Sequence, residues 1–249
     1  MLKVSWKYSV IVGAVFWLLS GNVMATPVPG TALQDVLDGI TTDPSGSSSV
    51  DVSNDYLRYD ERWEITASGG SVATMIIELA SFAANNIFGV YDNGNYVPLF
   101  DGSAIAGDQA ILSIHADGSV YVNFGDTGKD FSGNNFGFYL DSSAYSTGGL
   151  WHSETSLNTD GEDHMYAYQG NNSDKIQLPG YLEGLWTDSE YILAFEDLNG
   201  INSDWDFTDM VVMVESVNPV PEPATLLLFG TGLIGIAGFT RRKLNLKRS

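Results

Sequence analysis

Short apolar runs separated by turn residues dominate the middle of the chain. Residues 86–91 and 96–100 flank the turn sequence Asp-Asn-Gly-Asn. Asn-Gly between two apolar runs is the strongest short signal for a β-hairpin, because both residues tolerate positive φ. Residues 110–115 and 120–124 flank an Asp-Gly turn in the same way. The pattern therefore predicts two hairpins.

Further apolar runs continue this pattern, and helical periodicity is weak. Gly, Asn, Asp and Ser are abundant between the runs. Many short strands joined by such turn residues predict an all-β fold, an antiparallel β-sandwich of the jelly-roll kind. The further strands are expected at residues 136–140, 165–168, 191–195 and 210–214.

Two segments do not follow the strand pattern clearly. Residues 32–37 have the composition of one short helix with Thr31 as its N-cap. Residues 74–82 fit a buried strand or a helix, and periodicity alone leaves both open. Residues 43–54 are expected to form a loop. There is no internal repeat and no sign of a second core, so the pattern predicts one domain.

The N-terminus has the three-part pattern of a secretory signal peptide. Lys3 and Lys7 precede an apolar run over residues 10–19, and the small-residue sequence Val-Met-Ala ends at Ala25. The apolar run is too short for a first transmembrane helix, which needs roughly 17–25 residues. We therefore predict that residues 1–25 are removed during export.

The C-terminus combines an uncharged apolar segment with a basic tail. Residues 224–240 carry no charge and are just long enough for one transmembrane helix. The tail at 241–249 is basic, which predicts that it stays in the cytoplasm. Pro221 and Pro223 prevent a regular helix from starting much earlier. The exported part is then anchored to the membrane from its C-terminal end.

These boundaries define the expected organisation of the exported part. Residues 26–85 form its N-terminal part and residues 86–217 form the β-sandwich. Residues 218–223 are expected to be a linker to the membrane helix.

The charge of the exported part excludes one class of partner. Residues 27–220 contain 30 Asp and Glu against four Lys and Arg, a net charge of −26. Binding to nucleic acid requires a basic patch that neutralises phosphates, so no nucleic acid is expected. The acidic surface serves either solubility or the recruitment of divalent cations. The chain has no cysteine, so no disulfide stabilises the exported part.

The C-terminal pattern resembles a known sorting signal. Val220, Pro221, Glu222 and Pro223 precede the short Gly-rich apolar segment, and Arg241, Arg242 and Lys243 follow it. This order is similar to the PEP-CTERM signal of Gram-negative bacteria. The resemblance implies export, a temporary membrane anchor, and processing by a membrane exosortase. It also implies a protein of the cell surface, the extracellular matrix or the exopolysaccharide.

An unusually long acidic connection separates the last two predicted strands. Residues 196–209 hold five carboxylates, whereas hairpin loops normally have about 2–5 residues. Like charges this close repel one another, and Ca²⁺, which takes six to eight oxygen ligands, relieves that repulsion. A solvated loop with its carboxylates turned apart is the alternative. The predicted calcium ligands are Asp197, Asn199, Asp204, Asp206 and Asp209.

Two aromatic residues alternate with the acids of this loop. Trp205 and Phe207 are expected to anchor the loop to the sandwich, and stacking of Trp205 on a carbohydrate is the alternative. Residues 195–197 and 204–211 also resemble the closing motif of a bacterial domain of unknown function found in PEP-CTERM proteins and adhesins. That resemblance covers roughly residues 86–215 and implies a β-sandwich without an established activity. Ser203 stands where the family usually has Gly.

The sequence offers little support for catalysis. It has no Gly-x-Ser-x-Gly, His-Glu-x-x-His or Gly-x-x-x-x-Gly-Lys motif. His115 lies beside a hairpin turn and is expected to be exposed. His152, next to Trp151, is expected in a loop, and a binding or catalytic role is the alternative. A second acidic cluster at residues 160–164 is interpreted as a polar loop, although it could approach the first cluster. We expect a non-catalytic surface or matrix protein; the alternative is a secreted carbohydrate-active hydrolase, which would need two facing carboxylates.

The sorting signal predicts a difference in mass between two strains. In cells that lack the exosortase-type enzyme, the C-terminal tail should stay attached, because nothing else removes it. Intact-mass spectrometry of the exported protein from both strains measures this directly. Identical masses with and without the enzyme would contradict the sorting prediction.

Overall fold

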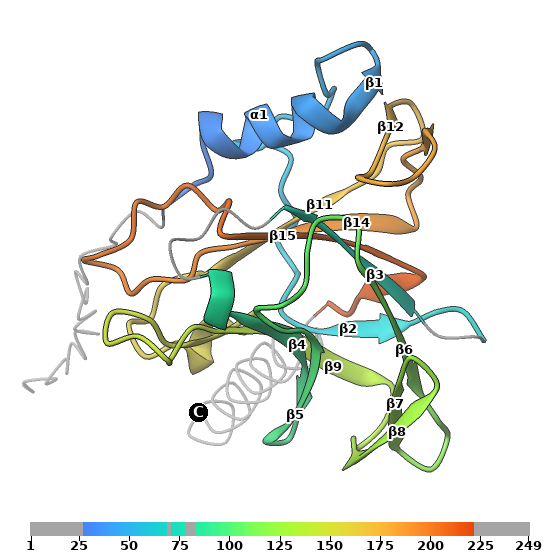
Figure 1. Cartoon of the computed structure of the whole chain (residues 1–249), viewed down its shortest axis with the longest axis vertical. Helices are drawn as coiled ribbons and strands as arrows, with labels where there is room; N and C mark the ends of the chain where they lie inside the picture. The colour runs from blue at the N-terminus through green and yellow to red at the C-terminus, as the bar shows by residue number, and fades with distance from the viewer. Residues whose placement is uncertain (1–26, 69–70, 78–82, 222–249) are drawn as a thin grey trace, which may run out of the picture.

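Three layers of secondary structure lie on one another in the computed structural model (Figure 1). The structure describes residues 27–68, 71–77 and 83–221. Helix α1 (Thr31–Ile40) lies on one face of a seven-stranded sheet, and a six-stranded sheet packs on the opposite face. The prediction of an antiparallel β-sandwich is confirmed.

The seven-stranded sheet runs in the order β11-β14-β15-β3-β6-β7-β8, and every neighbouring pair is antiparallel. Its strands are β3 (Ser71–Ile77), β6 (Gln109–Ile114), β7 (Ser119–Val122), β8 (Gly125–Asp130), β11 (Met165–Gln169), β14 (Glu190–Phe195) and β15 (Met210–Glu215).

The six-stranded sheet runs in the order β16-β2-β9-β4-β5, and β10 pairs with β9 outside this path. A three-stranded sheet, in the order β1-β12-β13, lies beside α1. The strands of the six-stranded sheet are β2 (Trp63–Ile65), β4 (Ile87–Asp92), β5 (Asn95–Phe100), β9 (Asn135–Asp141), β10 (Leu150–His152) and β16 (Val217–Pro219). The remaining elements are β1 (Thr41–Asp43), β12 (Lys175–Ile176), β13 (Gly184–Leu185) and the 3₁₀ turns η1 (Ala83–Asn85) and η2 (Thr155–Leu157).

Both predicted hairpins are confirmed. Asp92 pairs with Asn95, so Asn93 and Gly94 alone make the turn between β4 and β5, with φ of 48° and 79°. Two positive φ angles are what a two-residue turn requires, because its twist then matches that of the strands. In the second hairpin, β6 pairs with β7. The segment left open between strand and helix is strand β3 over residues 71–77; residues 78–82 lie outside the described residues.

The central strands of the seven-stranded sheet are buried on both faces. Side chains alternate between the faces of a strand, so each apolar run serves two cores. The core between the sheets takes Tyr191, Leu193, Phe195, Met210, Val212 and Val214, and the core beneath α1 takes Ile192, Ala194, Val211 and Met213. The sequence predicted one core; the structure has two on opposite faces of the same strands.

Helix α1 covers the second core through two side chains one turn apart. Leu33 and Leu37 are both 0% exposed. The Gln34 side chain accepts a hydrogen bond from the backbone N–H of Val52, which ties the following loop to the helix. The short helix is confirmed, but Thr31 is its first residue rather than its N-cap. Gly30 occupies the cap, and no side chain bonds there.

The two ends of the described chain are built into the sheets. Strand β16 pairs with β2, with Val217 opposite Ile65 and Pro219 opposite Trp63. The predicted linker at 218–223 therefore starts too early, because backbone pairing continues through Pro219 at the sheet edge. The Val220 N–H also donates to the Arg62 carbonyl over 2.7 Å. The N-terminal part supplies β2 to one sheet and β3 to the other.

The signal peptide and the predicted membrane helix lie outside the described residues, as do Glu222, Pro223 and the basic residues of the sorting signal. In the part of the chain that the structure does describe, no helix has the length and apolarity that a membrane span requires.

Tyrosine rings cover glycines on the outer face of the six-stranded sheet. Gly89 of β4 is paired with Tyr139 of β9, and Tyr91 of β4 is paired with Gly137 of β9. A Cβ atom added to Gly89 would lie 2.2 Å from the Val97 carbonyl oxygen and 2.7 Å from the Tyr139 ring. Neighbouring backbone therefore approaches too closely for any side chain at this position.

We predict that Gly89→Ala destabilises the protein by about 1–3 kcal/mol, because the added methyl group forces backbone apart in a packed sheet. For a domain of this size the thermal midpoint should fall by roughly 2–4 °C per kcal/mol. Gly133→Ala is the matched control, because a Cβ there meets no atom within 4 Å. Equal midpoints for the two variants in thermal unfolding would contradict this packing.

Candidate metal centre

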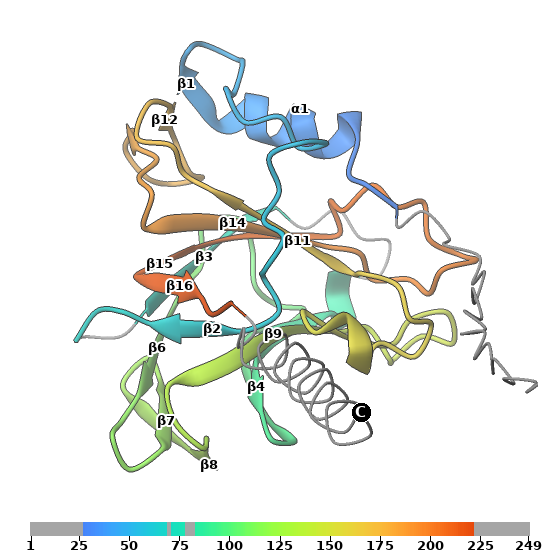
Figure 2. The same ribbon diagram turned by 180° about the vertical axis from the view of Figure 1, so that it is seen from behind.

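The acidic connection joins two neighbouring strands at one end of the sandwich (Figures 1 and 2). Phe195, the last residue of β14, pairs with Met210, the first residue of β15. Continuing that register places Glu196 opposite Asp209 where the strands separate. The backbone N–H of Asp197 donates to Asp209 Oδ2 over 3.0 Å. The same pairing that builds the core thus brings the two ends of the acidic connection together.

Three carboxylates converge at this point. One oxygen from each of Glu196, Asp206 and Asp209 lies within 4.8 Å of the others. Glu196 is 0% exposed, and neither of its carboxylate oxygens has a hydrogen bond of standard geometry among the described residues, although Ser203 and the Asp209 carboxyl group lie close enough to influence its pKa. A buried carboxylate without a partner is costly, so the group needs a proton or a cation.

The environment favours the protonated form when no cation is present. Burial raises the pKa of Asp209 to about 9, and the neighbouring Glu196 and Asp197 carboxylates add to the rise. Burial raises the pKa of Glu196 to about 7. Burial raises the pKa of Asp197 as well. Three neighbouring acids with raised pKa values are typical of a functional site.

The predicted ligands separate into two groups. Asp206 and Asp209 belong to the three-carboxylate group. Asp197 lies beside it, buried, and its Oδ2 accepts from Asn86 Nδ2 over 3.0 Å. Asp204 is exposed, and Asn199 Oδ1 accepts from Asn202 Nδ2 over 2.6 Å. Among the acids of the loop, Asp204 is not part of the three-carboxylate group. Its third member is Glu196, which sequence reasoning placed in the acidic connection but not among the ligands.

Unusual backbone angles set the direction of Asp206. Trp205 and Phe207, on either side of it, both have φ of 56°. Bulky side chains rarely adopt this left-handed conformation, which costs of order 1–3 kcal/mol. Asp206 Oδ1 accepts from the N–H and the hydroxyl of Thr208, which holds the turn.

The two aromatic residues of the loop have different surroundings. Phe207 is 0% exposed and its ring meets Tyr166 edge-on with 4.8 Å between centroids. This confirms Phe207 as the anchor of the loop. Trp205 is only half-buried, at the margin of the second core.

His164, directly before the neighbouring strand β11, contacts the backbone of Glu196. The His164 ring stacks on Trp151 with 3.8 Å between centroids and 5° between planes. Its Nδ1 lies 3.0 Å from the Glu196 carbonyl oxygen, and its Nε2 lies 3.0 Å from Asp160 Oδ2. Asp160 Oδ2 also accepts from the N–H of Gly200. The second acidic cluster therefore does approach the first, as a support and not as a member of the three-carboxylate group.

Other supporting residues come from distant parts of the chain. Asn86 precedes β4, and the Trp151 indole of β10 donates to the Asp197 carbonyl over 2.8 Å. The Ser142 hydroxyl donates to the same carbonyl. No local sequence signal marks these residues, because only the packing of the two sheets brings them to the loop.

The other histidines lie elsewhere. His115 is exposed, as expected, and its ring stacks on Tyr121. His152 is buried within β10 instead of lying in a loop, and its Nε2 lies 2.9 Å from the Tyr96 hydroxyl.

Comparisons with known proteins identify two segments. Residues 106–217 match the model of a domain of unknown function (DUF4114), and residues 219–243 match the PEP-CTERM protein-sorting motif. No curated protein matches the chain, and no solved structure matches it. Strands β2 to β5 precede the matched domain but complete the same two sheets. The sorting motif marks a protein that is exported, anchored at the membrane and processed by an exosortase-type enzyme. The chain therefore carries a PEP-CTERM sorting motif directly behind a DUF4114 domain.

Proposed function

We propose that this protein is a non-catalytic module of the cell surface or extracellular matrix whose acidic loop binds Ca²⁺. One observation carries the proposal: Glu196 is fully buried, neither of its carboxylate oxygens has a hydrogen bond of standard geometry among the described residues, and it lies within 4.8 Å of ligand atoms from Asp206 and Asp209. A divalent cation among these oxygens would offset both the burial of Glu196 and the repulsion among the three acids.

The chemistry of the donor set supports Ca²⁺ over other cations. All donors in the group are carboxylate oxygens, which hard cations prefer. Zn²⁺ favours Cys and His, but the chain has no cysteine and both ring nitrogens of His164 face other partners. Mg²⁺ demands a nearly ideal octahedron, whereas Ca²⁺ accepts irregular sets of six to eight oxygens. Three carboxylates that each bind through both oxygens would supply up to six ligand oxygens.

Export also favours calcium. The protein acts outside the cytoplasm, and calcium sites of extracellular modules need only modest affinity, with dissociation constants of about 10⁻⁴–10⁻³ M. A domain with a net charge of −26 attracts divalent cations through its field.

The alternative, a carbohydrate-active hydrolase, is less well supported. Such an enzyme places two carboxyl groups about 5–9.5 Å apart across an open cleft. In this loop three carboxylates, and not two, have oxygens within 4.8 Å of one another, and Glu196 has no exposure to a substrate. This arrangement suits a bound cation better than a sugar ring between two acids.

Calcium should raise the thermal midpoint of the purified full-length protein. A cation at about 100 times its dissociation constant adds roughly 2.7 kcal/mol, which corresponds to about 5–11 °C for a domain of this size. Asp206→Asn should remove most of this increase. Asp204→Asn is the matched control, because it removes the same charge from an exposed position in the same loop. No increase in the wild type, or equal losses in both variants, would contradict the calcium site.

Without calcium, stability should fall as pH rises. Asp209 in the folded protein has a pKa of about 9, above its ordinary value of 3.8, so its stabilising contribution is complete below about pH 4 and is lost as pH rises toward 9. Glu196 contributes with the same sign, up to about pH 7. Calcium binds the ionised carboxylates, so the stabilisation by calcium should grow over the same range.

Thermal unfolding at pH 5, 7 and 9, with chelator and with calcium, measures both trends. Asp209→Asn removes the titrating group and should flatten the chelator series relative to the wild type. A wild-type protein whose calcium-free stability follows the same pH course as Asp209→Asn would show that Asp209 does not govern it.

A further inference from the structure

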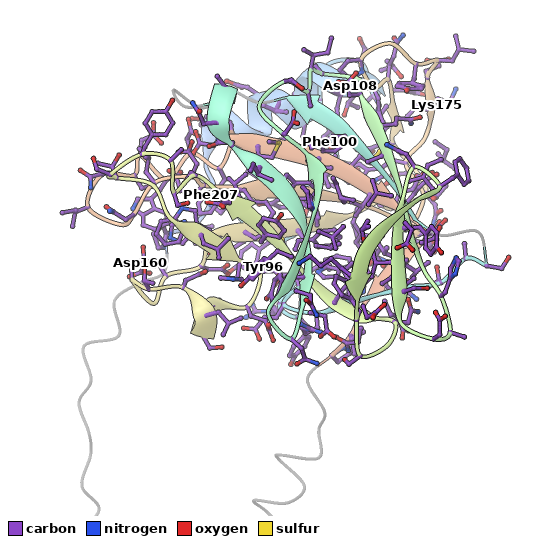
Figure 3. The ribbon with its side chains drawn as sticks, turned by 60° about the horizontal axis from the view of Figure 1, so that its bottom comes forward. Tyr96, Phe100, Asp108, Asp160, Lys175 and Phe207 are labelled. Atoms are coloured by element: carbon purple, nitrogen blue, oxygen red, sulfur yellow. The ribbon has the colours of Figure 1, made fainter. Side chains whose placement is uncertain are left out.

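An open hollow lies beside the candidate metal centre. It is formed by Pro27, by the segment before β11 and by residues 199–205 of the acidic connection, and its volume is about 570 Å³. This is within the range of about 300–1,000 Å³ found for small-ligand sites. Figure 3 shows Asp160 and Phe207 at this end of the sandwich, far from Lys175. The residues that line the hollow include Thr159, Asp160, Glu162, Asn199, Ile201 and Trp205.

One part of the lining is apolar and open to solvent. Ile201 is 96% exposed, and Trp205 is half-buried with part of its ring facing the hollow. Gly200 lies next to both groups: a Cβ added there would lie 3.6 Å from the Trp205 indole and 3.7 Å from Asp160 Oδ2, which is ordinary contact. An aromatic ring thus lies directly beside a carboxylate.

The polar part of the lining has unused hydrogen-bonding capacity. The structure gives the Thr159 hydroxyl and the Glu162 carboxylate no hydrogen-bond partner among the described residues. Asp160 uses Oδ2 for His164 and Gly200 and Oδ1 for the N–H of Glu162. A carboxylate has about four lone-pair positions, so one acceptor position of Asp160 stays available.

We propose that this hollow binds a neutral polysaccharide. A pyranose ring has an apolar face of C–H groups that fits an indole ring, and hydroxyl groups at its edge that donate to carboxylates. Trp205 and Ile201 would receive the apolar face, while Glu162, Asp160 and Thr159 would bond the hydroxyls.

Charge decides which kind of polysaccharide fits. The exported part has a net charge of −26, and two acids line the hollow itself. A polymer of uronic acids or phosphates would be repelled, because none of the described residues that line the hollow is Lys or Arg. Neutral hexose chains carry no charge to be repelled and offer many hydroxyl donors.

This inference rests on the proposed calcium site. Residues 197–205, which include Asn199, Ile201 and Trp205, lie between the two carboxylates Glu196 and Asp206. A cation bound to both would hold the ends of this stretch and so position the wall of the hollow. Binding of the sugar should therefore require calcium.

The experiment is calorimetric titration of the purified full-length protein with cellohexaose, maltohexaose and laminarihexaose, each with calcium and with chelator. Oligogalacturonate serves as the anionic probe. We expect at least one neutral oligosaccharide to bind in calcium only, and no binding of oligogalacturonate. Trp205→Ala should weaken that binding by about tenfold or more.

Phe124→Ala is the matched control for Trp205→Ala. Phe124 is also an exposed aromatic residue with positive φ, 81% exposed and with φ of 66°, but it lies in the hairpin between β7 and β8. Its removal should leave binding unchanged. Ile201→Ala and Glu162→Gln test the hollow without disturbing the core, since both side chains lie outside the two cores; each should weaken binding.

The outcomes separate the two proposals. If calcium raises the thermal midpoint but no neutral oligosaccharide binds, the sugar site is wrong and the calcium site stands. Sugar binding that survives in Trp205→Ala, Ile201→Ala and Glu162→Gln, or equal binding in chelator, overturns the inference as well. If calcium has no effect on stability, the proposed function fails first. A preference for oligogalacturonate would contradict the charge argument.

Discussion

The pairing of β14 with β15 is the contact on which the rest of the structure depends. These two strands lie inside the seven-stranded sheet and are buried on both faces, so each supplies side chains to the core between the sheets and to the core beneath α1. Side chains alternate along a strand, and a slip of one residue would exchange the two sets. Leu193, for example, would move from the core between the sheets to the core beneath α1, and Ile192 would move in the opposite direction. The register is therefore strongly determined.

The same register creates the electrostatic problem at the end of the strands. It places Glu196 opposite Asp209 just beyond the last apolar pair, in a region that the sandwich keeps from water. Acids in such a place are stable only if they keep a proton or share a cation, because burial disfavours the charged form. Their pKa values are raised for this reason. The sorting motif marks a protein that is exported and anchored at the membrane.

Two features hold the acidic loop in place: the packing of the His164 ring and the left-handed backbone at Trp205 and Phe207. The His164 ring stacks on the Trp151 ring, and its Nε2 contacts the carboxylate of Asp160. Its Nδ1 contacts the backbone carbonyl of Glu196. On the other side, Trp205 and Phe207 hold left-handed backbone angles that turn Asp206 toward the group. Such strain persists only where the surroundings over-determine it, and the buried Phe207 ring provides that. The half-buried Trp205 is left at the surface, beside the hollow.

Local patterns in the sequence predicted both hairpins, four further strands, the C-terminal sorting motif, and the position of the acidic connection between two apolar runs. These features follow from short-range rules: the alternation of apolar and polar residues, turn residues with positive φ, and the length of the uncharged segment.

Which acids meet was decided only by the tertiary structure. Glu196 joins the group because of strand register, while Asp204 stays exposed outside it. Asn86 and Trp151 reach the loop across more than 40 residues of chain, through the packing of one sheet on the other. A single sequence carries no local signal for such contacts, because they depend on side chains that become neighbours only after the sandwich has closed.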